Sequence, residues 1–180
     1  MELKDALKAG YIGDLKRLYD EAFPDDEKKP FDYMLKLTDA GKMEMLAVEE
    51  EGRFAGLIIN LLCSDDVALL DYFAVDPSMR SFGIGGRALK LLLEKFSDKK
   101  LIFEIERPDS ALPDTDMKAR RKRFYLRNGV KETGVFANVY NTDFELLTND
   151  GKLKYDEYVM ALRDAMGDRV DELLKPRELF

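Results

Sequence analysis

The amino-acid sequence predicts a mixed α/β fold in which antiparallel strands and one strand–helix–strand unit share a sheet. Three strand-like runs follow one another between residues 43 and 75, and only short polar breaks separate them, which is typical of hairpins. A glycine-bearing turn and an apolar helix at 84–96 then lead directly to a further strand at 101–105. A right-handed crossover would lay this strand parallel to the one at 67–75, which makes the sheet mixed (α+β).

The N-terminal part is predicted to be a short strand at residues 2–7 followed by two helices. Apolar residues recur at helical spacing over residues 11–23, and this helix ends because Pro24 cannot continue it. A second apolar periodicity from Phe31 ends at Gly41, a residue type that commonly follows a helix.

The later elements follow from the same signals. The central strands are predicted at 43–48, 54–62 and 67–75, with breaks at Glu51-Gly52 and at residues 64–66. Beyond a loop at 109–114, the patterns predict a helix at 116–127, strands at 131–136 and 139–147, a helix at 153–166 that stops at Gly167, and a short final helix capped by Asp168.

The composition of the 180 residues excludes several classes of protein. The sequence has no histidine, and its one cysteine, Cys63, is interpreted as a small buried apolar residue, which excludes the usual zinc sites and histidine-dependent catalytic sets. A net charge of −7 disfavours nucleic acid as the main partner. The chain contains no apolar run long enough for a membrane span or a signal peptide. We expect a cytoplasmic protein without a metal ion.

The most informative segment is the turn at residues 76–86. A strand that feeds a glycine-rich turn and then a helix presents unpaired backbone N–H groups at the positive end of the helix dipole. Gly83, Gly85 and Gly86 would let a phosphate approach the backbone, and Arg80 adds a positive charge. The segment is therefore predicted to bind an anion.

Two other interpretations of this turn remain open. Gly83, Gly85 and Ala88 also fit the spacing of a dinucleotide-binding turn, and Glu104 lies about twenty residues on, where a ribose-binding acid is expected. Seven residues separate Val75 from Gly83, however, whereas a dinucleotide turn directly follows its strand. A glycine-rich turn without any ligand is the third interpretation.

Two motifs resemble the GNAT superfamily of N-acetyltransferases. Arg80-x-x-Gly83-x-Gly85 is similar to the acetyl-CoA-binding pattern of that family, and Tyr125, four residues before Gly129, matches its second signature. The resemblance covers about residues 1–147. It implies a GNAT-like acyl-CoA N-acyltransferase fold over 1–147. Residues 148–180 lie beyond the resemblance; because the helix predicted at 153–166 carries an apolar stripe, they are expected to form a C-terminal helical extension that packs on the domain or on a partner subunit in a homodimer.

The resemblance also implies a reaction, the transfer of an acetyl group from acetyl-CoA to a primary amine by direct attack. The acceptor would be an amine of a small molecule or of a peptide. The resemblance implies that backbone amides of the turn hold the pyrophosphate of the co-substrate and that the backbone at the end of the preceding strand pairs with pantetheine and polarises the thioester carbonyl. The implied contacts are Phe73, Ala74, Val75, Arg80, Ser81, Phe82, Gly83, Ile84, Gly85 and Gly86.

Candidate acid and base groups come from the phenol and the carboxylates near these motifs. Tyr125 is expected to protonate the leaving thiolate, because a phenol is protonated at neutral pH. Glu104 and Glu106 lie two residues apart in one strand, so they should point to the same face and at least one is the expected base. Asp71 is a third candidate for the base.

Other charged segments have weaker assignments. Arg121 lies four residues before Tyr125 and is expected to reach a phosphate of CoA, whereas most of the basic run at 118–123 is expected to face solvent. The acidic residues 25–27 lie where the family builds its acceptor wall, and they either attract a cationic amine or form an ordinary linker. The alternative to an enzyme is a binding module of the same fold that holds acyl-CoA without turnover.

Overall fold

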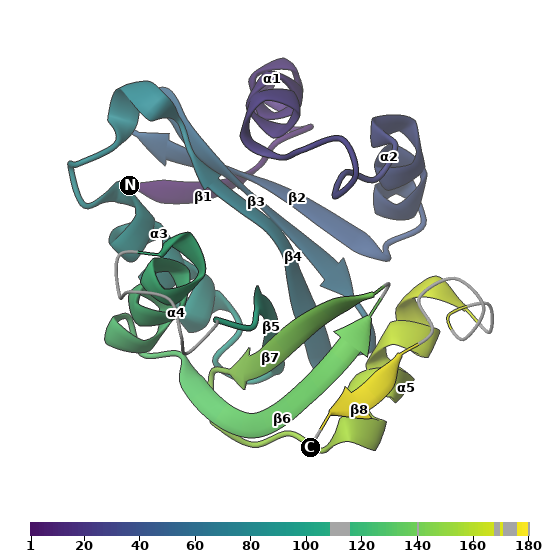
Figure 1. The fold of residues 1–180 in the computed structure, drawn as a ribbon. Coiled ribbons are helices and arrows are strands. Elements are labelled where there is room, and N and C mark those ends of the chain that lie inside the picture. The colour runs from purple at the N-terminus through teal and green to yellow at the C-terminus, as the bar shows by residue number, and fades with distance from the viewer. Residues whose placement is uncertain (109–115, 140, 168–169, 171–175, 180) are drawn as a thin grey trace. The chain divides into compact units, whose positions relative to one another are not determined.

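The computed structural model describes residues 1–108, 116–139, 141–167, 170 and 176–179. These residues form eight strands, five α-helices and one short 3-10 helix (Figure 1). The chain divides into two compact units, residues 1–62 with 70–95 and residues 63–69 with 96–180. The strands of both units are mixed with helices, as the sequence predicts, which confirms the α/β fold class.

The first unit is built on four neighbouring strands. Their order is β1 (Glu2–Asp5), β2 (Met43–Glu50), β3 (Arg53–Leu62) and the end of β4 (Val67–Val75). β2 pairs antiparallel with both β1 and β3. The tight turn between β2 and β3 places Glu51 and Gly52 at positive φ, which explains the glycine there. The predicted hairpin at this position is thus confirmed.

Helices cover these strands through their apolar sides. α1 (Ile12–Ala22) contacts β3 and α2 (Phe31–Asp39) contacts β2, and both lie on one side of the strands (Figure 1). α3 (Ile84–Lys95) contacts β1 on the other side. Each helix buries residues at helical spacing, such as Leu15 and Leu18 in α1 and Leu89 and Leu92 in α3. The predicted bounds of these helices agree with the structure to within about two residues.

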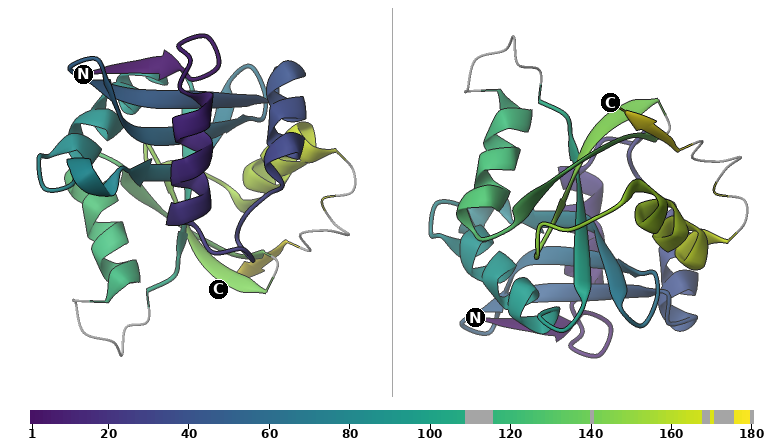
Figure 2. Two further views of the ribbon diagram at one scale, coloured as in Figure 1. Left: turned by 90° about the horizontal axis from the view of Figure 1, so that it is seen from above. Right: turned by 90° about the horizontal axis from the view of Figure 1, so that it is seen from below.

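The second unit surrounds the strand β5 (Lys100–Glu106). Its strand order is the start of β4, then β5, β7 (Thr142–Thr148), β6 (Lys131–Val139) and β8 (Arg177–Leu179). β7 pairs antiparallel with β5 and β6, and β6 pairs antiparallel with β8. α4 (Met117–Arg127) and α5 (Tyr155–Met166) lie on opposite sides of these strands (Figure 2).

Two features of the C-terminal part differ from the predictions. β6 continues to Val139, beyond the predicted end at 136, because a bulge between Glu132 and Val135 absorbs Gly134 at positive φ and restores the register. β8 was not predicted, since a three-residue edge strand has too few residues to show an alternating pattern. The loop predicted at 109–114 and most of the short helix predicted after Asp168 lie outside the described residues.

The apolar stripe of α5 is buried within the second unit. Tyr158, Ala161, Leu162 and Ala165 are all nearly or fully buried, and α5 contacts β6. None of the helices in the described ranges is long and apolar enough to cross a membrane.

One close approach of two backbones limits the sequence of the first unit. A Cβ atom added to Gly56 in β3 would lie 2.5 Å from the carbonyl oxygen of Ala74 in β4. We expect Gly56→Ala to lower the free energy of unfolding by about 1–3 kcal/mol, because one of the two strands must shift. Gly13→Ala is the control, because a Cβ there meets open space in helix α1, and it should stabilise by ~0.5–1 kcal/mol. Urea unfolding of both variants measures the difference; equal stabilities would contradict the steric interpretation.

Candidate functional site

The turn that follows β4 is held by the carboxylate of Asp76. This nearly buried side chain accepts hydrogen bonds from the backbone N–H of Ser78 at 3.0 Å and from its hydroxyl at 2.6 Å. Arg17 of α1 donates to the same carboxylate at 2.7 Å. These hydrogen bonds lower the pKa of Asp76, and the hydrogen bond from the Ser78 hydroxyl has the largest effect. The backbone of Asp76 also donates to Ala55 in β3, at 2.9 Å, so this turn has a fixed start.

The segment between this turn and α3, predicted to bind an anion, makes a sharp bend in the structure. Ser81 and Gly83 have φ of 69° and 71°, which turns the chain sharply before α3 begins at Ile84. The Cβ direction of Gly83 opens into free space. The first N–H groups of a helix lack partners within the helix and carry the positive end of its dipole. The turn and the helix therefore leave room and donors for a phosphate group.

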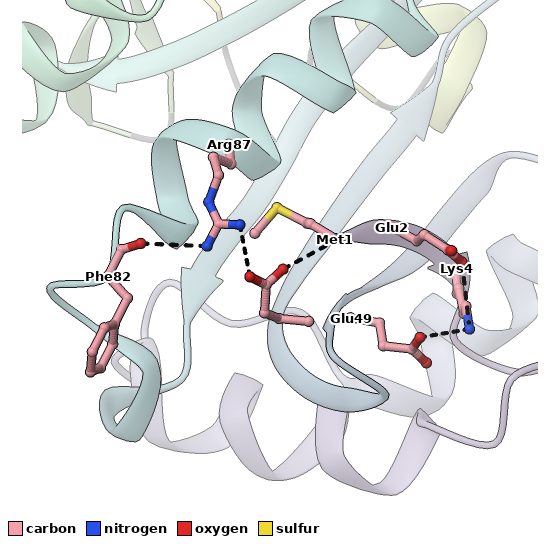
Figure 3. Close-up of polar contacts among 7 residues, drawn as sticks. Met1, Glu2, Lys4, Glu49, Phe82 and Arg87 are labelled. Carbon is pink, nitrogen blue, oxygen red and sulfur yellow. Dashed lines mark hydrogen bonds and ion pairs between the residues drawn. The ribbon is translucent and has the colours of Figure 1, made fainter.

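Two arginines beside this segment have different environments. Arg80 is exposed, and its Nε donates to the carbonyl of Val75 at 3.3 Å. Arg87, in the first turn of α3, donates to Glu50 at 2.7 Å and to the carbonyl of Phe82 at 3.4 Å (Figure 3). Glu50 also lies 3.3 Å from the N-terminal ammonium of Met1. Arg87 therefore links the turn to Glu50 and Phe82, whereas Arg80 is exposed and, within the described part of the chain, bonds only to the backbone.

The end of β4 carries a carboxylate and a phenol that bind the loop between α1 and α2. Lys29 donates to both oxygens of Asp71, at 2.7 Å and 2.8 Å, and its ammonium lies 5.2 Å from the centre of the Tyr72 ring. Tyr72 packs edge-on against Tyr19 and Phe23, with ring centres 4.8 and 4.9 Å apart. Burial raises the pKa of Tyr72 to about 12, so this phenol is neutral at physiological pH.

Tyr125 lies in the second unit, in the last turns of α4. Its ring packs 5.2 Å from Phe103 of β5 and 5.4 Å from Phe124. Burial raises the pKa of the phenol to about 12, and the positive charge of Arg121 opposes that rise. The phenol therefore stays protonated at neutral pH, as an acid must. The effect of Arg121 on it also agrees with the predicted neighbourhood of these two residues on one helix face.

The two candidate bases of β5 bond to different helices. Tyr158 of α5 donates a hydrogen bond to Glu104, whereas Glu106 forms an ion pair with Lys118 of α4 at 2.5 Å. In a regular strand the side chains of Glu104 and Glu106 would point to the same face. Glu106 is, however, the last residue of β5, and its side chain contacts the first turn of α4 instead. Glu106 also lines an open hollow of about 610 Å³ at the end of β5, together with Arg107, Pro108, Lys118, Asn141, Thr142 and Asp143.

Most of the basic run of α4 is exposed, as expected, but its two lysines form ion pairs. Besides the ion pair of Lys118, the ammonium of Lys122 lies 2.8 Å from the buried Glu145 and 2.6 Å from Glu132. Arg120, Arg121 and Arg123 are exposed. The two lysines therefore attach α4 to the strands beneath it.

The predicted site residues thus fall into two groups. The contacts expected for the co-substrate at 73–75 and 80–86 belong to the first unit, as does the candidate base Asp71. The expected acid Tyr125, the candidate bases Glu104 and Glu106, and Arg121 belong to the second unit. Among the described residues, no cluster of acidic or sulfur-containing side chains could hold a metal ion. The sequence gives no sign that Arg17, Lys29 and Tyr158 bind the carboxylates near the candidate site. Each of them lies more than forty residues along the chain from the carboxylate that it binds.

The sequence profile described as the Acetyltransferase (GNAT) family matches residues 12–127. This match spans more than half of the chain, including the motif Arg80-x-x-Gly83-x-Gly85 and Tyr125, so the protein belongs to the GNAT family of acetyltransferases. No curated protein matches the sequence significantly.

Solved structures of GNAT proteins share the fold. A putative GNAT acetyltransferase from Bacteroides thetaiotaomicron is 22% identical, with a TM-score of 0.71 over 91% of this chain and 94% of that one. A spermidine N-acetyltransferase from Vibrio cholerae, solved with CoA and spermine, has 11% identity and a TM-score of 0.59 over 88% and 97%. The ribosomal-protein-S18-alanine N-acetyltransferase of Escherichia coli has 18% identity and a TM-score of 0.56 over 82% and 91%.

Because the pKa of Asp76 is lowered in the folded protein, its contribution to the free energy of unfolding should depend on pH. A carboxyl whose pKa is lower in the folded state stabilises the fold above its unfolded value, near 3.9, and loses that contribution as the pH falls through the folded value. We expect Asp76→Asn to lose about 1–3 kcal/mol of unfolding free energy at pH 7, because the partner Arg17 loses a charged acceptor. The difference from wild type should shrink below pH 4.

Urea unfolding at pH 7 and at pH 3.5 measures this dependence. The exposed Asp65, in the turn before β4, supplies the control variant Asp65→Asn, which should match wild type within about 0.5 kcal/mol at both pH values. If Asp76→Asn lost the same unfolding free energy at both pH values, the negative charge of Asp76 would contribute nothing to stability.

Proposed function

We propose that this protein transfers the acetyl group of acetyl-CoA to a primary amine. The observation that carries this proposal is the turn before α3, where Gly83 at positive φ, the exposed Arg80 and the start of a helix meet in a member of the GNAT family. This combination suits a pyrophosphate, which needs hydrogen-bond donors, positive charge and a backbone that it can approach closely. Neighbours of the same fold that acetylate spermidine or a protein amino group agree with an amine acceptor.

In this proposal the first unit holds the co-substrate. The backbone N–H groups of residues 80–86 and the guanidinium of Arg80 would bind the pyrophosphate. The backbone of Phe73, Ala74 and Val75 would bind the pantetheine arm, and an amide there would polarise the carbonyl that is attacked. Acetyl-CoA supplies the activated acyl group, a thioester. Arg121 is proposed as a further contact to a CoA phosphate.

Proton transfer is assigned to residues of the second unit. Tyr125 is the proposed acid, since its phenol, with a pKa of about 12, always carries its proton at neutral pH. Glu104 and Glu106 are the proposed bases, acting directly or through water, because an ammonium must lose a proton before it can attack. Of the two, Glu106 lines an open hollow, whereas Glu104 is held by the hydroxyl of Tyr158.

Acetyl-CoA binding tests the proposal first. Isothermal titration should give a dissociation constant in the micromolar range and no binding of NADH. We expect Gly83→Val to weaken acetyl-CoA binding at least tenfold, which corresponds to about 1.4 kcal/mol, because a β-branched residue cannot easily keep the φ of 71°.

The matched control for this variant is Gly41→Val. Gly41 has a φ of 70° and, like Gly83, open space around its Cβ direction, but it follows α2. This variant should bear the same backbone strain and still bind acetyl-CoA normally. If wild-type protein does not bind acetyl-CoA, the turn serves another ligand or none, and the proposed reaction is withdrawn.

The role of Tyr125 is tested by Tyr125→Phe. This substitution removes the hydroxyl and keeps the ring that packs on Phe103. We expect kcat to fall about 10²- to 10⁴-fold, while the affinity for acetyl-CoA stays within twofold. Tyr33→Phe, at an exposed phenol of α2, is the control and should leave kcat unchanged. Unchanged turnover in Tyr125→Phe would remove Tyr125 from the mechanism.

A further inference from the structure

A lysine of the chain itself occupies an ammonium-binding site beside the strand that is proposed to hold the thioester. The carboxylate of Asp71 contacts the ammonium of Lys29 with both oxygens, at 2.7 and 2.8 Å, and the face of the Tyr72 ring lies 5.2 Å away. A carboxylate and an aromatic face are the two groups that bind alkylammonium ions best. The site is therefore built for a primary amine, and Lys29 already lies in it.

The ammonium is not needed to hold its loop in place. The backbone N–H of Lys29 donates to the hydroxyl of Tyr72 at 3.1 Å, and its carbonyl accepts from the hydroxyl of Tyr19 at 3.0 Å. Tyr72 in turn donates to the carbonyl of Glu27 at 2.8 Å. Two buried phenols thus fix the backbone of the loop through hydrogen bonds that do not involve the Lys29 ammonium.

The position of Asp71 connects this site to the proposed chemistry. Asp71 lies two residues before Phe73 on β4, a separation of about 7 Å along the strand, and its side chain points to the same face as those of Phe73 and Val75. The side chain of Asp71 is only 10% exposed, whereas that of Lys29 is 26% exposed. A nearly buried proton acceptor thus lies next to an amine that solvent still reaches.

We propose that Lys29 is an acetylation site of the protein itself, modified within the same chain; this inference rests on the proposed use of acetyl-CoA. The ammonium of Lys29 gives one proton to Asp71, and the neutral amine attacks the carbonyl carbon of acetyl-CoA. A C–N bond forms and the C–S bond breaks. The electron pair of that bond leaves with the CoA thiolate, which takes up the second proton that the attacking nitrogen loses. The products are N-acetyl-lysine 29 and CoA.

Proton transfer within the pair becomes easier when water leaves the site. Two opposite charges in a poorly solvated place each carry a cost of desolvation, so a neutral amine beside a neutral carboxylic acid is a less unfavourable state there than in water. A co-substrate bound along β4 would exclude water from this site. The acetylation rate should therefore depend on Asp71.

Mass spectrometry of a single peptide tests the inference. Cleavage after glutamate releases residues 28–44, which carry Lys28, Lys29, Lys36 and Lys42. Lys36 and Lys42 are exposed and report uncatalysed acetylation by acetyl-CoA. We expect Lys29 to be acetylated at least tenfold faster than these two. Its first-order rate should not depend on protein concentration, because donor site and acceptor belong to one chain.

Asp71→Asn is the decisive variant. It keeps the shape of the side chain but cannot take a proton, so acetylation of Lys29 should fall at least tenfold while that of Lys36 and Lys42 stays the same. Lys29→Arg keeps the positive charge beside Asp71 and shows, by its thermal unfolding, whether the loop remains folded. Should Asp71→Asn fail to fold, the ranking of the four lysines in wild type and the independence of the Lys29 rate from protein concentration still decide the question.

Three results would overturn the inference. Lys29 could react no faster than Lys36 and Lys42, Asp71→Asn could leave its rate unchanged, or the rate could scale with protein concentration, which would make a second copy the donor. Titration of acetyl-CoA with the same protein preparations distinguishes a failure of the self-acetylation proposal from a failure of the proposed acetyltransferase function. If the protein binds acetyl-CoA but Lys29 stays unmodified, only the self-acetylation proposal is overturned. If the protein neither binds acetyl-CoA nor acetylates Lys29, both proposals are overturned.

Discussion

The buried carboxylate of Asp76 is the contact on which the candidate co-substrate site depends. It lies at the end of β4 and binds two groups from different parts of the chain, the N–H and hydroxyl of Ser78 in the turn and the guanidinium of Arg17 in α1. A buried carboxylate is costly unless it is paired and hydrogen-bonded, so conformations of the turn that lose these donors are disfavoured. The turn therefore delivers residues 80–86 to the start of α3 in one arrangement.

The same principle recurs at two other acids of the first unit. Asp71 is paired with Lys29, and Glu50 is paired with Arg87 and with the N-terminal ammonium. The side chains of Asp71, Asp76 and Glu50 are 10%, 11% and 16% exposed, so each would be left as a poorly solvated charge if its partner were removed. In a chain of net charge −7, cations from distant segments are thus used to hold the strand ends and the turn that surround the candidate site.

Local patterns explain why most of the fold could be predicted. The helices α1, α3 and α5 repeat apolar residues at a spacing that only a helix places on one side, and Pro24 or Gly167 stops two of them. The turn before α3 could be predicted because its glycines and arginine are close together in the sequence. The bulge at Gly134 and the strand β8 could not be predicted. A bulge shifts the alternation of apolar and polar residues by only one position, and three residues are too few to show an alternation at all.

The sequence by itself determined the α/β class, the order of the helices and of the strands up to β7, the glycine-rich turn before α3 and the family to which the motifs belong, because these depend on residues that are near one another along the chain. Only the tertiary structure decided which charged groups meet. Arg17 with Asp76, Lys29 with Asp71, and Tyr158 with Glu104 are pairs separated by 59, 42 and 54 residues. No local pattern encodes such pairs, because strand pairing and helix packing, rather than spacing along the sequence, bring these side chains within hydrogen-bond distance.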